Sequence, residues 1–292
     1  MRAGHWTSFA LLLSLPACLQ AALGAVPARD VTEIVYAHVD GHDLALDLHL
    51  PAGVRHPPLV VYAHGGAWRA GNRSEYPKFL VERGYAVASV DFRASTDARF
   101  PADVQDIKAA IRFLRARAAD YGCRTDRIAV AGASSGAHLA ALVATTNGLS
   151  ELEGSEGDHA QQSSAVQALV SWYGASDLMT ILDQSTPFGH SVREPALKLL
   201  LGGLPTEVPE LAKLASPVTH VDARDPPAIL LHGDQDPQMP VNQTLELEAE
   251  YRRAGVPVEL VVVDGAKHGG DAFYEGEPAA RVIAFLRRTI GR

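Results

Sequence analysis

Short runs of β-branched and small apolar residues alternate with helical segments through most of the chain, and this alternation restricts the fold more than any other feature. The runs cover residues 59–63, 86–90, 128–131, 169–172, 229–231 and 258–263. Strands that are apolar throughout are buried on both faces, and helices between such strands join parallel neighbours. The sequence therefore predicts an α/β fold with a mostly parallel central sheet and helices on both faces.

Period-2 alternation of apolar residues marks the N-terminal part of the chain. It covers residues 31–39 and 44–50, separated by Asp40 and Gly41, and this pattern is typical of an antiparallel hairpin. In residues 102–121, apolar side chains instead recur at spacings of three and four. This spacing predicts a helix with one buried face.

Two stretches interrupt the alternation. Residues 150–164 are rich in Gly, Ser, Glu and Gln, which predicts an exposed loop. Residues 177–220 contain several prolines and weakly periodic leucines, which we interpret as a short inserted cap. A chain of 292 residues with 47% hydrophobic residues can form one large core, so we expect a single domain over residues 29–292.

Residues 1–28 have the pattern of an export signal. Arg2 precedes an apolar run over residues 9–23, and small residues follow. Residues 15–18 also resemble a lipoprotein cleavage box with Cys18 as the acylated residue, although proline is unusual there. We expect a periplasmic or secreted protein, with a lipid anchor at Cys18 as the alternative. No later segment approaches the roughly 20 apolar residues that a spanning helix needs.

Charge and ligand spacing argue against two kinds of binding partner. The formal net charge is −8 and no basic stripe is present, which argues against a nucleic-acid partner. The histidines and cysteines show neither H-E-x-x-H nor C-x-x-C spacing, so no metal site is expected. The oligomeric state stays open.

Residues 132–136 read GASSG, a G-x-S-x-G pattern between a predicted strand and a predicted helix. This context is typical of a strained turn that lifts a serine hydroxyl clear of the sheet, and glycines on either side avoid collisions in so tight a turn. The following helix directs N–H groups and the positive end of its dipole toward developing negative charge. Ser134 is therefore the candidate nucleophile.

A second turn, at Gly65 and Gly66, directly follows the strand predicted over residues 59–63. Glycines let the backbone turn its N–H groups toward a substrate oxygen. A G-x-S-x-G fold of this kind places the loop that binds the oxyanion at this position. Gly65, Gly66 and the Ser135 amide form the candidate oxyanion hole, worth about 3 kcal/mol per donor.

A serine hydroxyl needs a base to take its proton, and the base needs a carboxylate to orient it. Asp236 and His268 each follow a predicted strand, at the sheet edge where sites form in open α/β sheets. Asp234 competes for the role of the acid, but it lies closer to the strand end and is better placed to hydrogen-bond the loop backbone. The candidate catalytic triad is Ser134, Asp236 and His268.

Eight segments follow one another in a specific order. They are HGGAW at 64–68, DFR at 91–93, FPAD at 100–103, GASSGAHLA at 132–140, SWYGASDL at 171–178, SPVTHV at 216–221, HGDQDPQMPV at 232–241 and GAKHGG at 265–270. Together they resemble the hormone-sensitive-lipase-like and feruloyl-esterase-like branch of the α/β-hydrolases. The resemblance implies the α/β-hydrolase fold, the same triad and no cofactor. Ala67 replaces a glycine common in lipase-type members, a variant similar to carboxylesterases and arylformamidases of the branch.

The resemblance also suggests four pocket residues, although large aromatic residues are as often part of the core. They are Trp68, Trp172, Tyr173 and Phe188. We expect a serine carboxylic ester hydrolase that acts on small acyl or aromatic, feruloyl-type esters. Arylformamidase or serine peptidase activity is the alternative, because an acyl-enzyme mechanism serves both ester and amide bonds. A noncatalytic binding protein is the third hypothesis.

Overall fold

The computed structural model describes Met1 and residues 26–291. Most of the predicted export signal, including the alternative anchor at Cys18, lies outside the described residues, and both hypotheses stay predictions. No helix within the described part of the chain is long and apolar enough to cross a membrane.

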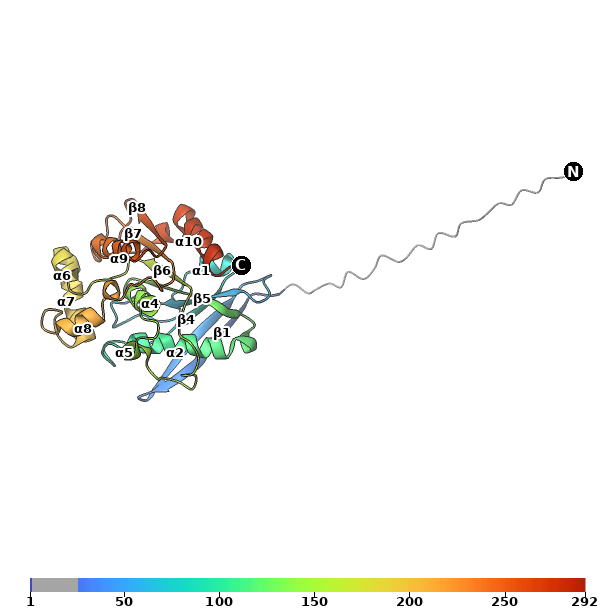
Figure 1. Ribbon diagram of the computed structural model, residues 1–292, viewed down its shortest axis with the longest axis horizontal. Coiled ribbons are helices and arrows are strands. Elements are labelled where there is room, and N and C mark those ends of the chain that lie inside the picture. Colours follow the sequence, from blue (N-terminus) through green and yellow to red (C-terminus); the bar gives the residue numbers. More distant parts are fainter. Residues whose placement is uncertain (2–25, 292) are drawn as a thin grey trace.

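An eight-stranded sheet forms the centre of the structure (Figure 1). Its strands follow the order β1-β2-β4-β3-β5-β6-β7-β8, and every pair from β4 to β8 is parallel. The strands are β1 (Arg29–Val39), β2 (His42–Leu50), β3 (Pro58–Ala63), β4 (Ala86–Val90), β5 (Arg124–Ala133), β6 (Ala168–Trp172), β7 (Ala228–Gly233) and β8 (Val258–Val263). The six predicted apolar runs lie in β3 to β8, which confirms the mostly parallel sheet.

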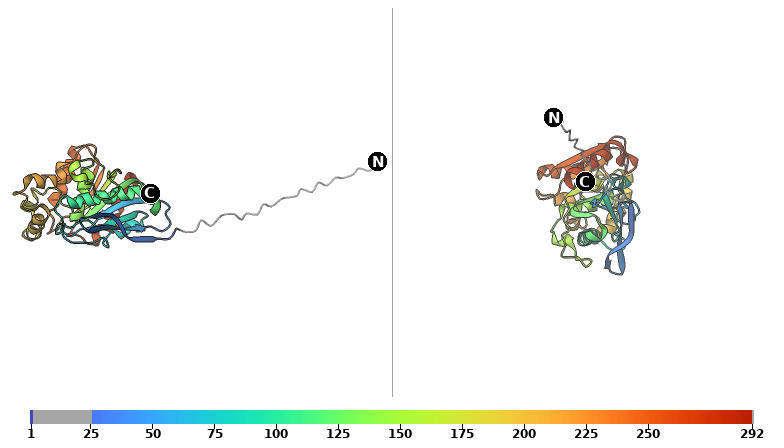
Figure 2. Two further views of the ribbon diagram at one scale, coloured as in Figure 1. Left: turned by 90° about the horizontal axis from the view of Figure 1, so that it is seen from below. Right: turned by 90° about the vertical axis from the view of Figure 1, so that its right-hand side faces the viewer.

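β1 and β2 form an antiparallel hairpin at one edge of the sheet (Figure 2). Asp40 and Gly41 make its two-residue turn, with φ angles of 49° and 80°. Positive φ at both positions suits a type I′ turn, whose twist matches that of the strands. β2 then pairs antiparallel with β4, with Leu46 opposite Val90. The predicted hairpin is therefore confirmed as part of the same sheet.

Helices cover both faces of the sheet. In β3, Val61 packs in an apolar cluster with Leu139, whereas Val60 packs on the opposite face with Leu286. The helices are α1 (Lys78–Glu82), α2 (Ala102–Ala116), α3 (Ala118–Tyr121), α4 (Ser135–Thr145), α5 (Ser150–Glu153), α6 (Ile181–Gln184), α7 (Pro187–Leu201), α8 (Pro209–Leu214), α9 (Val241–Arg253) and α10 (Gly276–Thr289), with 3-10 turns η1 (Pro217–Thr219) and η2 (Asp271–Phe273). The helix predicted over residues 102–121 is divided at Arg117, whose ψ of 14° is not helical.

The prediction of an exposed loop over residues 150–164 is wrong at its beginning. The first four residues form α5, and Leu152 is fully buried in the apolar cluster. Glu153 accepts a hydrogen bond from the buried Lys108 Nζ at 2.8 Å. Arg112 of α2 also pairs with the Glu153 carboxylate, at 3.6 Å. The buried leucine and the two ion pairs of Glu153 therefore hold this polar segment against α2.

The segment between β6 and β7 contains α6, α7, α8 and η1. The three helices group together at one side of the structure (Figure 1). Thr186 caps α7 by accepting a hydrogen bond from the Gly189 N–H at 3.0 Å. One face of α7 is buried through Gly189, Ala196, Leu197 and Leu200, at spacings of three, four and seven. These helices occupy the range that the sequence predicts for a cap.

Asp103, in the first turn of α2, is a buried acid with 1% exposure. Its Oδ1 accepts a hydrogen bond from the Val104 N–H at 2.9 Å, whereas Oδ2 has no partner among the described residues. Burial, reinforced by the nearby Asp106, raises the pKa of Asp103 to about 7. The folded chain therefore retains a proton at a pH where the unfolded chain releases it.

We expect Asp103→Asn to become progressively more stable than the native protein as the pH rises from about 4 to about 8. The unfolded carboxyl ionises near pH 3.9 whereas the folded one ionises near 7, so the stability present at low pH is lost between these values. The gain should reach on the order of a few kcal/mol in the free energy of unfolding, measured by denaturant titration. Asp97→Asn, at an exposed position, is the control and should show a constant difference. A constant difference for Asp103→Asn would contradict the prediction.

Candidate active site

Ser134 lies in the turn between β5 and α4. Its φ of 54° and ψ of −122° are sparsely populated for a residue with a side chain and cost about 1–3 kcal/mol. Two glycines make this turn possible. A Cβ on Gly132 would lie 2.2 Å from the Gly136 carbonyl oxygen, and a Cβ on Gly136 would lie 2.1 Å from the Ala63 carbonyl oxygen of β3. The N-terminus of α4 can therefore contact the sheet only because these positions lack side chains.

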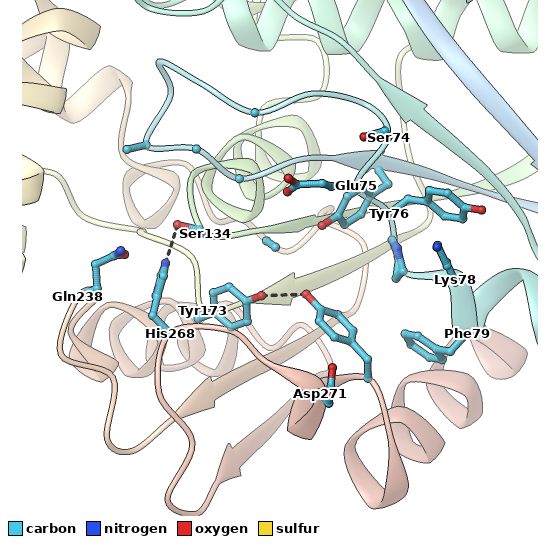
Figure 3. Close-up of a pocket in the computed structure, with 18 of the residues that line it drawn as sticks. Ser74, Glu75, Tyr76, Lys78, Phe79, Ser134, Tyr173, Gln238, His268 and Asp271 are labelled. Atoms are coloured by element: carbon cyan, nitrogen blue, oxygen red, sulfur yellow. Dashed lines mark hydrogen bonds between the residues drawn. The ribbon is translucent and has the colours of Figure 1, made fainter. Parts of the chain in front are cut away.

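His268, in the loop after β8, links the serine to an acid. Its Nε2 lies 2.8 Å from Ser134 Oγ (Figure 3), and its Nδ1 lies 2.6 Å from Asp236 Oδ2. The Asp236 side chain is fully buried, and the imidazole is 15% exposed. A neutral imidazole in this geometry donates from Nδ1 to the carboxylate and accepts the serine hydroxyl proton at Nε2. The structure brings the three predicted residues together in one hydrogen-bonded chain.

Several donors surround the Asp236 carboxylate. Its Oδ1 accepts hydrogen bonds from the backbone N–H groups of Gln238 and Met239, both at 2.8 Å. His232 Nε2 lies 3.3 Å from Oδ2. Burial raises the pKa of Asp236, but hydrogen bonds from His232 and His268 outweigh burial and hold the pKa well below its usual range. Asp236 is therefore an anion at neutral pH.

Asp234 has a different contact. Its Oδ1 accepts a hydrogen bond from the Gly265 N–H at 2.8 Å, at an exposed position. This bond joins the loop after β7 to the loop after β8, which carries His268. Asp234 therefore positions the loop backbone, while Asp236 contacts the imidazole.

Gly65 and Gly66 line the pocket that holds Ser134. Gly66 has a φ of 129°, and a Cβ there would lie 1.9 Å from the Ala70 carbonyl oxygen, so the turn requires glycine. Within residues 26–291, no backbone carbonyl accepts a hydrogen bond from the Gly65 or Gly66 amide. Both N–H groups thus lack a backbone acceptor among these residues. The Ser135 side chain is buried, and its backbone begins α4 directly after Ser134.

Trp68 follows this turn but is not among the residues that line the pocket. It is 1% exposed, and its Nε1–H donates to His138 Nδ1 at 3.0 Å. The other ring nitrogen of His138 then carries the proton and donates to the Ala215 carbonyl oxygen at 2.7 Å. Burial lowers the pKa of His138 to about 4. The prediction of a pocket contact for Trp68 is wrong, because this hydrogen bond directs the indole into the core.

Two of the other predicted pocket aromatics also lie elsewhere. Trp172 is fully buried and packs edge-on against Phe79, because alternation along β6 turns it into the core. Phe188 is 56% exposed on the outer side of α7, away from the pocket lining. Tyr173 does line the pocket, and its hydroxyl lies 2.8 Å from that of Tyr274 (Figure 3).

The pocket has a volume of about 1030 Å³ and includes residues that sequence reasoning missed. They include Tyr62, Tyr76, Phe79, Tyr274, Glu75, Asp271, Gln238 and Arg193. Of these, only Arg193 has a signal in the sequence. Once α7 is recognised as a helix, the spacing of its apolar residues places this charged residue on the buried face. No group of three His, Cys, Asp or Glu side chains within the described ranges could hold a metal ion.

A mostly parallel sheet with Ser134 in a strand-to-helix turn, and with Asp236 and His268 on loops after later strands, defines the class of α/β-hydrolase folds. The BD-FAE family model matches residues 46–251. The chain therefore belongs to the BD-FAE family.

Comparison with individual proteins gives a consistent result. Esterase LipQ of Mycobacterium tuberculosis is 34% identical over 224 residues, which are 74% of this chain and 51% of LipQ. The chain thus spans about half the length of the curated relatives it matches. A truncated carbohydrate esterase from gut microbiota is 30% identical, with a TM-score of 0.81 over 90% of this chain and 97% of that structure. Propionate-bound esterase Est2 of Thermogutta terrifontis is 27% identical, with a TM-score of 0.70 over 90% and 94% of the two chains.

We expect Gly136→Ala to destabilise the protein strongly, because the new methyl group would overlap the Ala63 carbonyl oxygen. The loss should be at least about 2 kcal/mol, or the variant should fail to accumulate as folded protein, measured by thermal denaturation. Ser135→Ala is the matched control in the same helix. It removes a buried hydroxyl that has no partner among the described residues, so stability should change little. Equal stability of both variants would show that the close approach of α4 is not a constraint.

Proposed function

We propose that this protein is a serine carboxylic ester hydrolase that acts through Ser134, His268 and Asp236 with an acyl-enzyme intermediate. The observation that carries the proposal is the continuous chain of hydrogen bonds of 2.8 Å and 2.6 Å from the serine hydroxyl to the buried carboxylate. The esterase relatives support the same class of reaction. The arrangement combines a strained, pocket-facing serine with a base and an acid. A noncatalytic binding protein would have no need of this combination.

In this mechanism Ser134 Oγ attacks the ester carbonyl carbon while His268 Nε2 takes the hydroxyl proton. The carbonyl oxygen becomes an oxyanion, which the N–H groups of Gly65, Gly66 and Ser135 stabilise. Asp236 stabilises the imidazolium and holds its tautomer. Collapse of the intermediate breaks the ester bond, and the alcohol leaves with the proton from Nε2. Water then attacks the acyl-enzyme with His268 again as the base, which releases the acid and restores the serine.

Small acyl or aromatic esters, including the feruloyl type, are the substrates we propose. A pocket of about 1030 Å³ has room for more than an acetyl group, and Tyr76 and Phe79 offer aromatic surface at one side of the serine (Figure 3). Tyr274 adds a third aromatic ring to the lining. The similarity to a carbohydrate esterase favours an ester of carbohydrate material. Glu75 and Asp271 at the same side could accept hydrogen bonds from sugar hydroxyls.

Ser134→Ala should lower kcat for p-nitrophenyl acetate by at least about a thousandfold, because it removes the attacking oxygen. Far-UV circular dichroism and the melting temperature should stay close to the native values. Ser150→Ala, on the surface helix α5, is the control and should keep full activity. In the native protein, a serine-directed organophosphonate should add its mass to the peptide that contains Ser134. Retained turnover in Ser134→Ala, or labelling at another serine, would refute the assignment.

Asp236→Asn should lower kcat by on the order of 10⁴, because an amide cannot hold the required tautomer of His268. Asp234→Asn should lower kcat by less than about tenfold, since its contact is with the Gly265 backbone. The two variants carry the same chemical change two residues apart, so their kcat values give a direct comparison. A larger effect at Asp234 would assign the role of the acid to the other carboxylate.

A further inference from the structure

Arg193 is a buried cation in the wall of the active-site pocket. It is 1% exposed, and it lines the pocket together with Ser134 and His268. Its Nε and Nη2 are shielded from solvent and have no hydrogen-bond partner among the described residues. No carboxylate in the described part of the chain forms an ion pair with it. Buried arginines are ordinarily paired with an anion, and this guanidinium has no anionic partner among the described residues.

The position of Arg193 is fixed by its helix. Thr186, at the start of α7, donates from its hydroxyl to the Pro237 carbonyl oxygen at 2.6 Å, and Gly189 packs against the same loop. Arg193 is one turn further along α7, on the same buried face as Gly189. Its guanidinium carbon lies 5.9 Å from the centre of the Trp68 ring. The helix therefore presents Arg193 to the pocket from a rigid support.

Nearby charges do not neutralise this cation. Burial lowers the pKa of Arg193 to about 10, so the guanidinium is still charged at neutral pH. Asp236 is the nearby anion, but its oxygens already accept hydrogen bonds from His268 and from two backbone amides. Arg69 adds a second positive charge nearby. An additional anion at this wall would be stabilised by a guanidinium that is already desolvated.

The part of the pocket away from Arg193 is lined mainly by negatively charged residues. Four acidic residues, accompanied by Lys78, line the pocket on the segments around α1 and η2: Glu75, Glu82, Asp271 and Glu275. In Figure 3, Glu75 and Asp271 lie on one side of the Ser134–His268 pair and Gln238 lies on the other. Gln238 precedes Met239 in the loop against which α7 packs. A negative group on the substrate would thus be repelled at one end and attracted at the other.

We propose that Arg193 binds a carboxylate carried by the ester substrate, and so determines which substrates are preferred and how they are oriented at Ser134. The planar guanidinium offers paired N–H donors that match the two oxygens of a carboxylate, which lysine cannot reproduce. The inference rests on the proposed ester hydrolysis. It adds a substrate class, esters with a free carboxylate within reach of the scissile bond, and a residue that recognises it.

Two pairs of esters test the proposal and locate the carboxylate. Monomethyl succinate and methyl succinamate differ only in a carboxylate or amide on the acyl side. Acetoxyacetate and acetoxyacetamide differ in the same way on the alcohol side. For each pair, kcat/KM is measured by pH-stat titration, and the value for the acid is divided by the value for the amide. A general loss of activity lowers both values and leaves this ratio unchanged. The variants are Arg193→Met, Arg193→Lys and, as the control for an exposed cation near the site, Arg69→Met.

In at least one pair, Arg193→Met should lower the acid-to-amide ratio by about tenfold or more, because a buried charge-assisted contact is lost. Arg193→Lys should lower it less, since it keeps the charge without the fork. Arg69→Met should change it by less than about threefold, because solvent screens an exposed charge. Unchanged ratios in both pairs for both Arg193 variants would overturn the proposal.

Failure of the proposed function has a different signature. If native protein hydrolyses none of the four esters, nor p-nitrophenyl acetate, the hydrolase assignment is wrong. The carboxylate site is then decided by calorimetric binding of the same four compounds to Ser134→Ala and to Ser134→Ala/Arg193→Met. Preferential binding of an acid over its amide that disappears with Arg193→Met supports the site. Equal binding of acid and amide in both proteins overturns it.

Discussion

Glycine at one position on each side of Ser134, Gly132 and Gly136, is the constraint on which the candidate active site depends. A methyl group at Gly132 or Gly136 would overlap backbone oxygen atoms of α4 or β3. With both positions empty, the first turn of α4 lies directly against the sheet, and the serine is forced into its unusual backbone conformation. The hydroxyl then projects toward loops that come from the ends of β7 and β8, more than a hundred residues later in the chain.

Two charged side chains near this serine, Asp236 and Arg193, differ in their hydrogen-bond partners. Asp236 has donors at both oxygens, so its charge is compensated inside the protein and its pKa is depressed. Arg193 lies in the same pocket with two nitrogens that have no partner in the described residues. A fully compensated ion is suited to a fixed role in positioning, whereas an uncompensated ion is suited to an exchangeable ligand. In the mechanism that we propose, this contrast would separate Asp236, which acts on every substrate, from Arg193, which selects among substrates.

The sheet and the three candidate catalytic residues could be predicted because strong local signals carry them. Strands buried on both faces appear as continuous apolar runs, and the serine turn needs glycines at fixed offsets. The errors came from features that depend on tertiary contacts. A single buried leucine, Leu152, anchors α5 within a polar stretch. Trp68 and Trp172 point into the core through contacts with His138 and Phe79 that are distant in sequence.

The pocket was the least predictable part, because its wall combines short pieces of many segments. Tyr62 comes from a strand, Tyr76 from a loop and Tyr274 from the position directly after η2, and no local pattern relates them. Arg193 was different, since α7 has a clear buried face and the arginine falls on it. A charged residue on the buried face of a helix can be recognised from the sequence only when the positions that form this face are known.

The buried imidazole of His138 has a consequence for recombining this protein with its relatives. It joins Trp68, beside the turn at Gly65 and Gly66, to the Ala215 carbonyl directly after α8. The helical segment between β6 and β7 is therefore not an interchangeable module, although it is contiguous in the sequence. A chimera that imports this segment from a relative must also supply an acceptor at the position of the Ala215 carbonyl. Without that acceptor, the graft would leave a donor unpaired in the core and weaken the support of the Gly65–Gly66 turn.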